Sequence, residues 1–366
     1  MIVGVLGGGQ LGRMLAIAGI PLGLKFRFLD PEPDAPAGQV GELFQGSFDD
    51  DNLLDRFASG LDAVTFEFEN VPADCLRRLA GRFAVYPGAD ALETVQDRLS
   101  EKRLFRALQI PTPPFFAIDL AAGLDGALGR NRFPSVLKTR RFGYDGKGQW
   151  VIRNPAETAS ILSQLPSEGG SLIVEGFVNF DREVSLIAAR GRNGDMVFYP
   201  LVENHHQGGI LRLSMAPAPD VTAALQETAQ RYVVRIAEAL NYVGVLAVEF
   251  FQCGDALLAN EIAPRVHNSG HWTIEAAETS QFENHLRAIL GLPLGSAAPR
   301  GFAAMWNVLG APPRCEDVLA VPGAHLHLYG KEPRAGRKIG HITLCSPDRA
   351  AVTERLDRIR VISPQS

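Results

Sequence analysis

Cysteine is scarce in this sequence, and its few copies form no metal-binding or redox pattern. The four residues, Cys75, Cys253, Cys315 and Cys345, are scattered, and no two of them have C-x-x-C spacing. A disulfide framework and a cysteine-rich zinc site are therefore excluded as leading interpretations. Scattered thiols of this kind are typical of proteins in a reducing compartment.

Long apolar runs are absent, and so is an excess of positive charge. No uninterrupted apolar segment approaches the roughly 20 residues that cross a bilayer. The chain enters a strand pattern at once, without the basic and apolar regions of a signal peptide. The net charge is −5 at pH 7, which argues against a general nucleic-acid surface. We therefore expect a cytoplasmic protein that binds neither membrane nor nucleic acid.

The first part of the chain alternates strand and helix patterns. Strands are predicted at 2–6, 25–30 and 61–69, and helices at 11–18 and 73–79. This rhythm predicts a parallel sheet, and hence a Rossmann-like domain over 1–93.

Two further domains are expected, since 366 residues suffice for two or three. A mixed α+β region over 94–300 opens with an amphipathic helix at 97–108 and closes with a Pro/Gly-rich linker. The last block, 301–366, has short strand patterns and a final helix, which predicts a small β-rich domain.

A pair of glutamates on a predicted hairpin is the most informative feature. Two apolar strand patterns, 243–251 and 256–262, flank a turn at 253–255 and place Glu249 opposite Glu261. Facing carboxylates destabilise a sheet unless something positive lies between them, and paired oxygen ligands suit Mg²⁺. The sequence therefore predicts a magnesium site here. The alternative is a solvated surface hairpin.

A first glycine-rich turn, Gly7–Gly12, has the spacing G-x-G-x-x-G between a strand and a helix, and Asp30 ends the next strand. This is the fingerprint of dinucleotide binding. Because such a turn can present its amides to any anion, a dehydrogenase and a purely structural turn both stay open.

A second glycine-rich loop, 143–149, follows a short strand that ends in Lys138. Glycines let backbone amides approach a polyphosphate, and the lysine adds a point charge. The spacing is not that of a P-loop. A plain glycine-rich hairpin is the alternative.

Histidine and arginine gather in two other segments. Arg265, His267 and His271 follow Glu261 in a Gly/Ser loop that lacks the helical context of a zinc site, which favours an anion holder over zinc. Arg337 and Lys338 lie in a predicted turn near the C-terminus that suits a phosphate monoester, or else a solvated surface.

Together these features resemble the ATP-grasp superfamily, whose members join a carboxylate to an amine through an acyl phosphate. Within it the sequence is most similar to the 5-(carboxyamino)imidazole ribonucleotide synthases of purine biosynthesis. The segments that carry the resemblance run through nearly the whole chain: GGQLGRM (8–14), TFEFENV (65–71), GYDGKGQ (143–149), NEIAPRVHNSGHW (260–272) and GRKIGH (336–341). One departure from many ATP-grasp enzymes is Ala263 in place of asparagine, so the third metal ligand is undefined.

The resemblance implies a fold and a set of ligands. The fold is an ATP-grasp of α/β and α+β type, with an N-terminal Rossmann-like domain and a small C-terminal β-rich domain. The resemblance implies that Arg98 and Lys138 bind the ATP phosphates and that a loop closes over them, formed by Gly143, Tyr144, Asp145, Gly146, Lys147, Gly148 and Gln149. Adenine would meet Glu175, Gly176, Phe177 and Val178, the ribose would meet Glu183, and His206 would lie in a loop beside the nucleotide. Glu249 and Glu261 would bind the metal, with Asn260 and Glu261 next to the nucleotide. The substrate ribonucleotide would meet Gln10, Glu67, Glu69, Tyr144, Arg337 and Lys338, and the catalytic residues would be Asp145, Arg265, His267 and Lys338, with Arg265 and His267 at bicarbonate. Glu67 and Glu69 would share one strand face, which leaves their roles unseparated.

The activity implied is a carbon–nitrogen ligation. ATP and bicarbonate carboxylate the amine of 5-aminoimidazole ribonucleotide through carboxyphosphate, releasing ADP and phosphate, with Mg²⁺ or Mn²⁺ and without biotin or NAD. The partners would be these small molecules and a second copy in a homodimer. Alternatives are another ATP-grasp ligase of the formate-dependent glycinamide ribonucleotide or biotin carboxylase type, a non-catalytic nucleotide-binding module, and an NAD(P)-dependent oxidoreductase.

Overall fold

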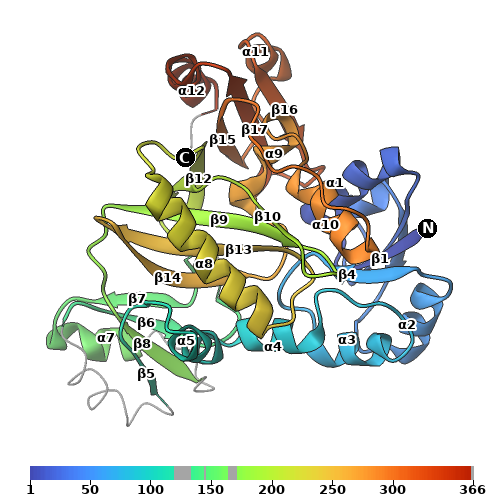
Figure 1. The fold of residues 1–366 in the computed structure, drawn as a ribbon, viewed down its shortest axis with the longest axis horizontal. Helices are drawn as coiled ribbons and strands as arrows, with labels where there is room; N and C mark the ends of the chain where they lie inside the picture. The colour runs from blue at the N-terminus through green and yellow to red at the C-terminus, as the bar shows by residue number, and fades with distance from the viewer. Residues whose placement is uncertain (119–132, 144–145, 164–170, 364–366) are drawn as a thin grey trace.

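The computed structural model describes residues 1–118, 133–143, 146–163 and 171–363. Within these ranges the chain forms three β-sheets flanked by helices (Figure 1). Nowhere in them is a helix both long enough and apolar enough to span a bilayer.

The N-terminal sheet is parallel throughout, as predicted, with strand order β3-β2-β1-β4. Its strands are β1 (Ile2–Leu6), β2 (Lys25–Asp30), β3 (Glu42–Gln45) and β4 (Ala63–Phe66), and its helices are α1 (Gln10–Gly19), α2 (Asp51–Ala58) and α3 (Ala73–Ala80), with the short turns η1 (Ile20–Leu22) and η2 (Pro36–Gln39). The sequence did not indicate β3, because that short strand is only partly buried and lacks a clear apolar alternation. The predicted third strand is too long, since the chain leaves the sheet after Phe66.

A central antiparallel sheet runs through the middle of the molecule, in the order β14-β13-β9-β11-β12-β15-β17-β16 with β10 beside β9. The strands are β9 (Arg182–Arg190), β10 (Met196–Phe198), β11 (Val202–Gln207), β12 (Ile210–Ala216), β13 (Gly244–Cys253), β14 (Ala256–Ala263), β15 (Phe302–Gly310), β16 (Ala324–Leu328) and β17 (Arg334–Ser346). The C-terminal strands thus extend this sheet through the pairing of β12 with β15.

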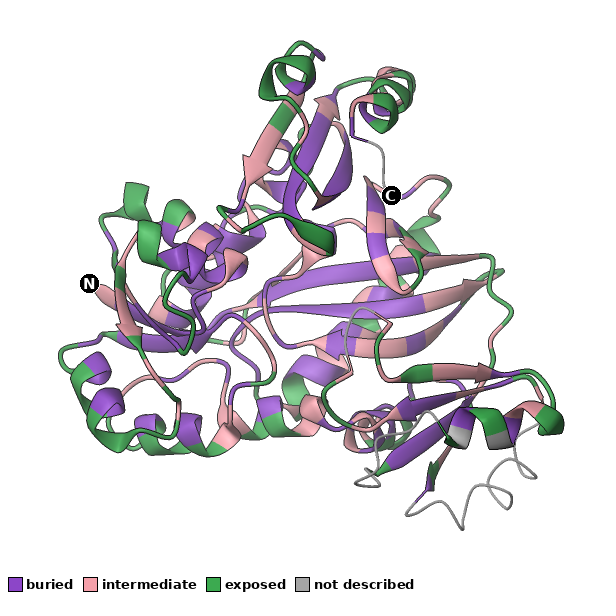
Figure 2. Cartoon of the chain, turned by 180° about the vertical axis from the view of Figure 1, so that it is seen from behind, coloured by how far each residue is buried: buried purple, intermediate pink, exposed green. Residues whose placement is uncertain are grey.

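The two faces of the central sheet differ along β13. Leu246, Val248 and Phe250 are buried under α8 (Ala223–Ala239), which crosses this face in Figure 1. Val245 and Ala247 face the other way and pack with α10 (Gln281–Leu290). Glu249 continues this second face, so the strict alternation of a strand delivers a carboxylate to the end of an otherwise apolar surface. Figure 2 shows the central strands buried over most of their length.

A small antiparallel sheet, β5-β8-β6-β7, forms a separate lobe beside the central one (Figure 1). It consists of β5 (Phe115–Ile118), β6 (Ser135–Thr139), β7 (Gln149–Ile152) and β8 (Leu172–Gly176). The remaining helices are α4 (Ala89–Gln96), α5 (Arg98–Ala107), α7 (Thr158–Leu162), α9 (Thr273–Ala276), α11 (Cys315–Leu319) and α12 (Arg349–Ile362), with the turns η4 (Pro155–Glu157) and η5 (Asn268–Gly270).

The start of α5 is fixed by Asp97. Its carboxylate accepts the N–H groups of Leu99 at 2.9 Å and Ser100 at 3.3 Å, as an N-cap does. Arg140, at the end of β6, binds both oxygens of the same carboxylate, at 3.0 and 2.6 Å. The cap therefore also ties α5 to the small sheet.

Two local predictions are wrong. Arg337 and Lys338 lie on the first, bulged part of β17 rather than in a turn, because the strand begins at Arg334. His206 lies on β11 rather than in a loop, and a bulge there shifts its pairing with β12.

Candidate active site

The predicted pairing of Glu249 with Glu261 is confirmed: the two residues are direct neighbours in the β13–β14 ladder. The turn at 254–255 alone would pair Glu249 with Asn260. A bulge makes Asn260 the extra residue and moves Glu261 into register. The two carboxylates consequently project from the same face.

Hydrogen-bond donors approach both carboxylates. Arg98 Nη1 donates to Glu261 Oε2 at 3.0 Å, and His267 Nε2 lies 3.4 Å from Glu249 Oε1. Burial and the facing Glu261 raise the pKa of Glu249. Burial alone would raise the pKa of Glu261 too, but the Arg98 guanidinium outweighs it and lowers that pKa. The two glutamates therefore differ in pKa, and Glu261 keeps its negative charge more readily than Glu249.

A chain of hydrogen bonds across the sheet orients His267. Ser214 Oγ donates to Asn204 Oδ1 at 2.8 Å, and Asn204 Nδ2 donates to Ser185 Oγ at 2.9 Å. Ser185 and Ser269 share the next bond, 2.8 Å long, and Ser269 Oγ lies 2.8 Å from His267 Nδ1. Every donor in this chain can point toward the imidazole.

The tautomer of His267 follows from this network. The backbone N–H of Ser269 also points at His267 Nδ1, at 3.3 Å, so Nδ1 must be an acceptor. The ring proton therefore sits on Nε2, which faces Glu249. Burial, aided by the charge of Arg265, lowers the pKa of His267 to about 3, which agrees with a neutral ring. His267 is thus a hydrogen-bond donor toward the carboxylate pair.

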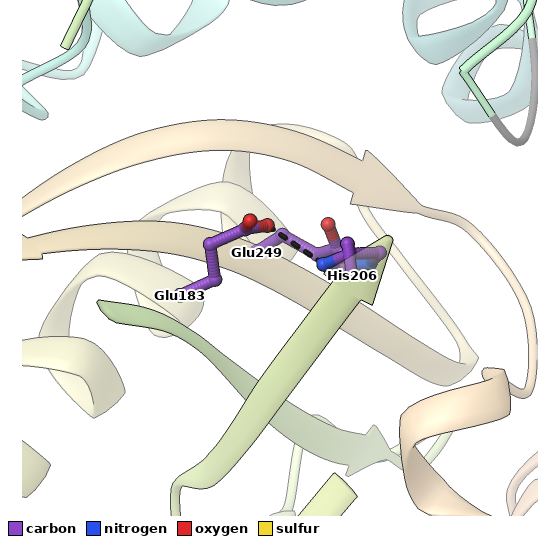
Figure 3. Close-up of side chains that lie close together, drawn as sticks. All are labelled: Glu183, His206 and Glu249. Atoms are coloured by element: carbon purple, nitrogen blue, oxygen red, sulfur yellow. Dashed lines mark ion pairs between the residues drawn. The ribbon is translucent and has the colours of Figure 1, made fainter. Parts of the chain in front are cut away.

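Glu249 also belongs to a group of three side chains of the kind that bind metal ions. Within the described ranges, Glu183, His206 and Glu249 form one group whose ligand atoms all lie within 4.8 Å of one another (Figure 3). His206 Nδ1 and Glu183 Oε2 form an ion pair at 2.9 Å. Burial alone would lower the pKa of His206, but Glu183 and Glu249 raise it.

Two lysines surround Glu175 between the small sheet and the central sheet. Lys138 Nζ binds Glu175 Oε2 at 2.9 Å, and Lys102 Nζ lies 3.5 Å from the same oxygen. Burial alone would raise the pKa of Glu175, but the two ammonium groups lower it to about 2. The carboxylate is only 2% exposed, so its partners are these lysines. Gly176 ends the strand, Phe177 and Val178 follow it, and the side chain of Phe177 is exposed.

The second glycine loop lies over Arg98 and the β11–β12 turn. A Cβ on Gly143 would lie 3.5 Å from Arg98 Nη2, and a Cβ on Gly146 would lie 2.8 Å from the Gly208 carbonyl. Gly148 has a left-handed φ of +71°, and its carbonyl accepts the Thr139 N–H. Gly146, Lys147, Gly148 and Gln149 are thus placed beside the phosphate-site candidates, while Tyr144 and Asp145 lie outside the described residues.

The first glycine turn is occupied by the protein's own carboxylates. Gly8 N donates to Asp30 Oδ2 at 2.6 Å, and Gly9 N and Gly12 N donate to the two oxygens of Glu67 at 2.6 and 2.8 Å. These are the amides that the phosphates of a dinucleotide would need. The geometry therefore favours the structural interpretation of this turn over a dinucleotide site.

Glu67 and Glu69 do not share a strand face, contrary to the prediction. β4 ends at Phe66, and Glu67 then turns toward the first glycine turn, where burial raises its pKa. Glu69 pairs with Arg265 instead. Burial alone would raise the pKa of Glu69, but Arg265 lowers it.

Basic side chains from the C-terminal strands reach this region. Lys331 donates to the Gln10 side chain at the first glycine turn. The charges of Arg337 and Lys338 help to lower the pKa of Lys331, after burial, so the three cations are near one another. Lys338 also lowers the pKa of Glu249, against burial. All three parts of the chain therefore contribute to one site.

Sequence reasoning missed several members of this site. Glu101 and Lys102 are 2% and 0% exposed, although the sequence predicts only an amphipathic helix at 97–108 and no buried charge in it. A signal was present, since Lys102 falls between the buried Leu99 and Phe105 at helical spacing. Ser185, in a buried strand, gave no comparable signal.

Comparison with known proteins first defines the class. The family model of the ATP-grasp domain matches residues 103–282, and that of the ribonucleotide synthetase preATP-grasp domain matches residues 1–96. The model of the phosphoribosylaminoimidazole carboxylase C-terminal domain matches residues 303–355. The fold is that of an ATP-grasp ligase.

The relatives then define the family. The N5-carboxyaminoimidazole ribonucleotide synthase of Pseudomonas aeruginosa is 52% identical over 362 residues, 99% of either chain. The crystal structure of the N5-carboxyaminoimidazole ribonucleotide synthetase from Thermus thermophilus is 60% identical, with a TM-score of 0.95, and covers 100% of this chain and 99% of that one. A structure from Aspergillus clavatus in complex with ADP and 5-aminoimidazole ribonucleotide is 30% identical, with a TM-score of 0.90 and 99% and 98% coverage. The chain belongs to the N5-carboxyaminoimidazole ribonucleotide synthase family, which confirms the family indicated by the resemblance.

Proposed function

We propose that this chain catalyses the ATP-dependent N-carboxylation of 5-aminoimidazole ribonucleotide in purine biosynthesis, with bicarbonate as the carbon source. The observation that carries the proposal is the paired Glu249 and Glu261, set among Arg98, Lys138 and the second glycine loop in a chain of this family. The enzyme is a ligase that forms a carbon–nitrogen bond and releases ADP.

The carboxylate pair fits a hard divalent cation. Glu249 and Glu261 offer oxygens from one face of a hairpin. The pKa of Glu249 is raised by burial first and then by repulsion from Glu261, and a bound cation would relieve that repulsion. Asn260 Oδ1 is buried and has no hydrogen-bond partner in the described part of the chain. Glu249 and Glu261 would hold Mg²⁺, or Mn²⁺ in its place, and the ion would neutralise charge on the transferring phosphoryl group.

The cations and the loop beside this pair suit a nucleotide polyphosphate. Arg98 and Lys138 would bind phosphate oxygens by charge-assisted hydrogen bonds, and Gly143–Gln149 would close over them. The segment Glu175–Val178 would meet adenine, Glu183 the ribose and His206 the nucleotide edge, with Asn260 beside Glu261. Because Glu175 is already bound by two lysines, the backbone that follows it is better placed than its carboxylate for the base.

The chemistry then proceeds in two steps. A bicarbonate oxygen attacks the γ-phosphorus and ADP leaves, giving carboxyphosphate; the amine of the ribonucleotide attacks its carbon, and phosphate leaves. Arg265 and His267 would hold bicarbonate, with His267 donating its Nε2 proton in a hydrogen bond rather than acting as a base. Carboxyphosphate hydrolyses readily, so a closed loop that excludes water raises the yield.

The ribonucleotide would bind between the N-terminal turn and the C-terminal strands. Gln10, Glu67 and Glu69 lie on one side and Arg337 and Lys338 on the other, and the bonds of Glu67 to the turn assign it mainly to shaping this wall. Tyr144, Asp145 and Lys338 complete the proposed site, with Asp145 and Lys338 in catalytic roles.

The organisation of the whole protein belongs to the same proposal. We divide the chain into 1–93, 94–300 and 301–366, and we expect a homodimer in the cytoplasm.

The test is ADP release from Mg-ATP and bicarbonate, measured with and without 5-aminoimidazole ribonucleotide. We expect strong dependence on the ribonucleotide and formation of the carboxyamino product. ADP release that requires formate and glycinamide ribonucleotide, or biotin, would contradict the proposal in favour of another ATP-grasp ligase. ATP bound without cleavage would indicate a non-catalytic nucleotide-binding module.

A further inference from the structure

One face of α5 holds the strand that carries Glu261. Arg98 binds the Glu261 carboxylate itself, as described above. One helical turn further on, Glu101 Oε1 accepts the backbone N–H of Ile262 at 2.6 Å, and Lys102 Nζ donates to the backbone carbonyl of Asn260 at 2.7 Å. The residues before and after Glu261 are therefore both bound by neighbouring side chains of one helix.

These contacts replace a missing strand. Among the described strands β14 is the edge of the central sheet, so no strand pairs with its outer side, where the N–H of Ala259 donates to the carbonyl of Pro111 at 2.7 Å. Asn260 is also the extra residue of the bulge, where the ladder to β13 is interrupted. A bulge with an open edge would be free to slip by one residue, and a one-residue slip would turn Glu261 to the opposite face of the sheet.

The burial of the two side chains shows that the arrangement is costly. Glu101 is 2% exposed and Lys102 is 0% exposed. Removing an ion from water costs several kcal/mol, and a well-packed apolar pair of similar size is often as stable. An apolar pair could not supply a fixed donor and a fixed acceptor to the two backbone groups beside Glu261.

Lys102 also contacts the lobe formed by the small β5-β8-β6-β7 sheet. Its ammonium lies 3.5 Å from Glu175 Oε2, an oxygen that also binds Lys138. It lies 3.2 Å from Thr112 Oγ1 as well. One buried lysine thus touches both the carboxylate at the end of β8 and the bulge that sets Glu261.

We propose that Glu101 and Lys102 are positioning residues of the reaction: together they lock the Asn260 bulge so that Glu261 faces Glu249, and Lys102 fixes this pair relative to Glu175. The inference rests on the proposed function for its meaning in turnover. The geometry of the metal pair can be tested without turnover.

The experiment compares Lys102→Met, Glu101→Asp and Glu101→Gln in the full chain. Mn²⁺ affinity in saturating ADP is measured by electron paramagnetic resonance, kcat and the KM for ATP by ADP release, and folding by thermal unfolding. Glu101→Gln keeps an oxygen at the same distance from the Ile262 N–H, whereas Glu101→Asp is one methylene too short. Arg103→Met is the matched control, because Arg103 is next to Lys102 on the same helix but is exposed.

We expect the Mn²⁺ dissociation constant to rise at least tenfold in Lys102→Met and Glu101→Asp, with a matching fall in kcat. In Glu101→Gln and Arg103→Met it should stay within threefold of wild type. Lower thermal stability with unchanged Mn²⁺ affinity and kcat would overturn the proposal in favour of a purely structural role. Loss of Mn²⁺ affinity in Glu101→Gln but not in Glu101→Asp would overturn it in favour of charge alone, because aspartate keeps the carboxylate charge.

Two outcomes need separate treatment. If Lys102→Met does not fold, the comparison of Glu101→Asp with Glu101→Gln still decides. If the wild type releases no ADP in response to the ribonucleotide, the proposed function fails, while the Mn²⁺ series still tests the positioning role.

Discussion

The two glycine-rich turns of this chain have similar sequences and opposite surroundings. At Gly7–Gly12 the backbone amides are bonded to Asp30 and Glu67. At the second loop, Gly143 and Gly148 lie near Arg98 and Thr139, with Lys138 close by on β6. The first turn has an internal anion, and the second is surrounded by cations.

This difference shows what a glycine pattern can and cannot predict. Glycines report that backbone amides are exposed to close approach, and the anion that approaches is set by residues elsewhere in the chain. In the first turn the anions are the carboxylates of Asp30, at the end of β2, and of Glu67, just after β4. At the second, the cations are bound to Glu261 and Glu175, and the anion proposed for the loop amides is a ligand phosphate.

The largest expected effect is on the use of ATP, and it comes from Lys138, on β6 beside the second loop. Lys138→Met should lower kcat/KM for ATP about a thousandfold, since it removes a charge-assisted bond and leaves Glu175 with Lys102 alone. The KM for the ribonucleotide should change far less. The measurement is steady-state ADP release, with the exposed Lys25→Met as control. Equal losses for both substrates would contradict a phosphate role.

A smaller effect is expected at the first turn, and in stability rather than nucleotide use. Glu67→Leu leaves the N–H groups of Gly9 and Gly12 without their acceptor, at a cost of about 3 kcal/mol in unfolding free energy. Denaturant unfolding measures that loss, and the KM for ATP should stay within about twofold. A large rise in that KM would mean that the first turn does bind the nucleotide.

The two buried carboxylates should respond to pH with opposite sign. The folded-state pKa of Glu175 is about 2, below its ordinary value of 4.5, so its contribution to stability is present above pH 4.5 and is lost as the pH falls through that window. The pKa of Glu67 is raised by burial, so its contribution weakens as the pH rises above 4.5.

Glu175→Gln should therefore reduce the loss of unfolding free energy between about pH 5 and pH 3 by about 2 kcal/mol. Glu67→Gln should leave that acid range nearly unchanged and alter the range above it. Unfolding curves across this series measure both, and identical acid profiles for the two variants would contradict the assignment.

The smallest expected effect isolates the contact of the second loop with the β11–β12 turn. A Cβ on Gly146 would meet the backbone of Gly208 and Gly209 at 2.8 and 2.9 Å, whereas a Cβ on Gly208 would meet nothing within 4 Å. Both glycines have a left-handed φ, so the strain is matched. Gly146→Ala should therefore raise the KM for ATP about tenfold more than Gly208→Ala, measured by ADP release.

Most elements of the fold could be predicted from the sequence because their apolar patterns are local. β1, β2, β13 and the C-terminal helix follow directly from alternation and periodicity. The hairpin follows from its turn, but that turn alone would pair Glu249 with Asn260 rather than with Glu261.

The rest depends on partners that are distant in the chain. The bulge at Asn260 is stabilised by Glu101 and Lys102, and nothing within the hairpin itself indicates it. Glu67 and Glu69 separate because one is bound by a glycine turn and the other by Arg265. A charged residue among the apolar positions of a helix, such as Lys102, is the one local sign of such a distant partner.

The pairing of β12 with β15 has a consequence for the order in which a newly made chain becomes an enzyme. A ribosome delivers the ATP-grasp strands long before β15, β16 and β17, and the contact of Lys331 with Gln10 joins two ends of the chain. Domains generally fold as units, starting from the N-terminus, during synthesis. The proposed nucleotide side of the site can therefore assemble first, and the proposed ribonucleotide side is completed only when the last strands join the sheet. An unfinished chain would then lack a complete substrate site in which to couple ATP cleavage to carboxylation.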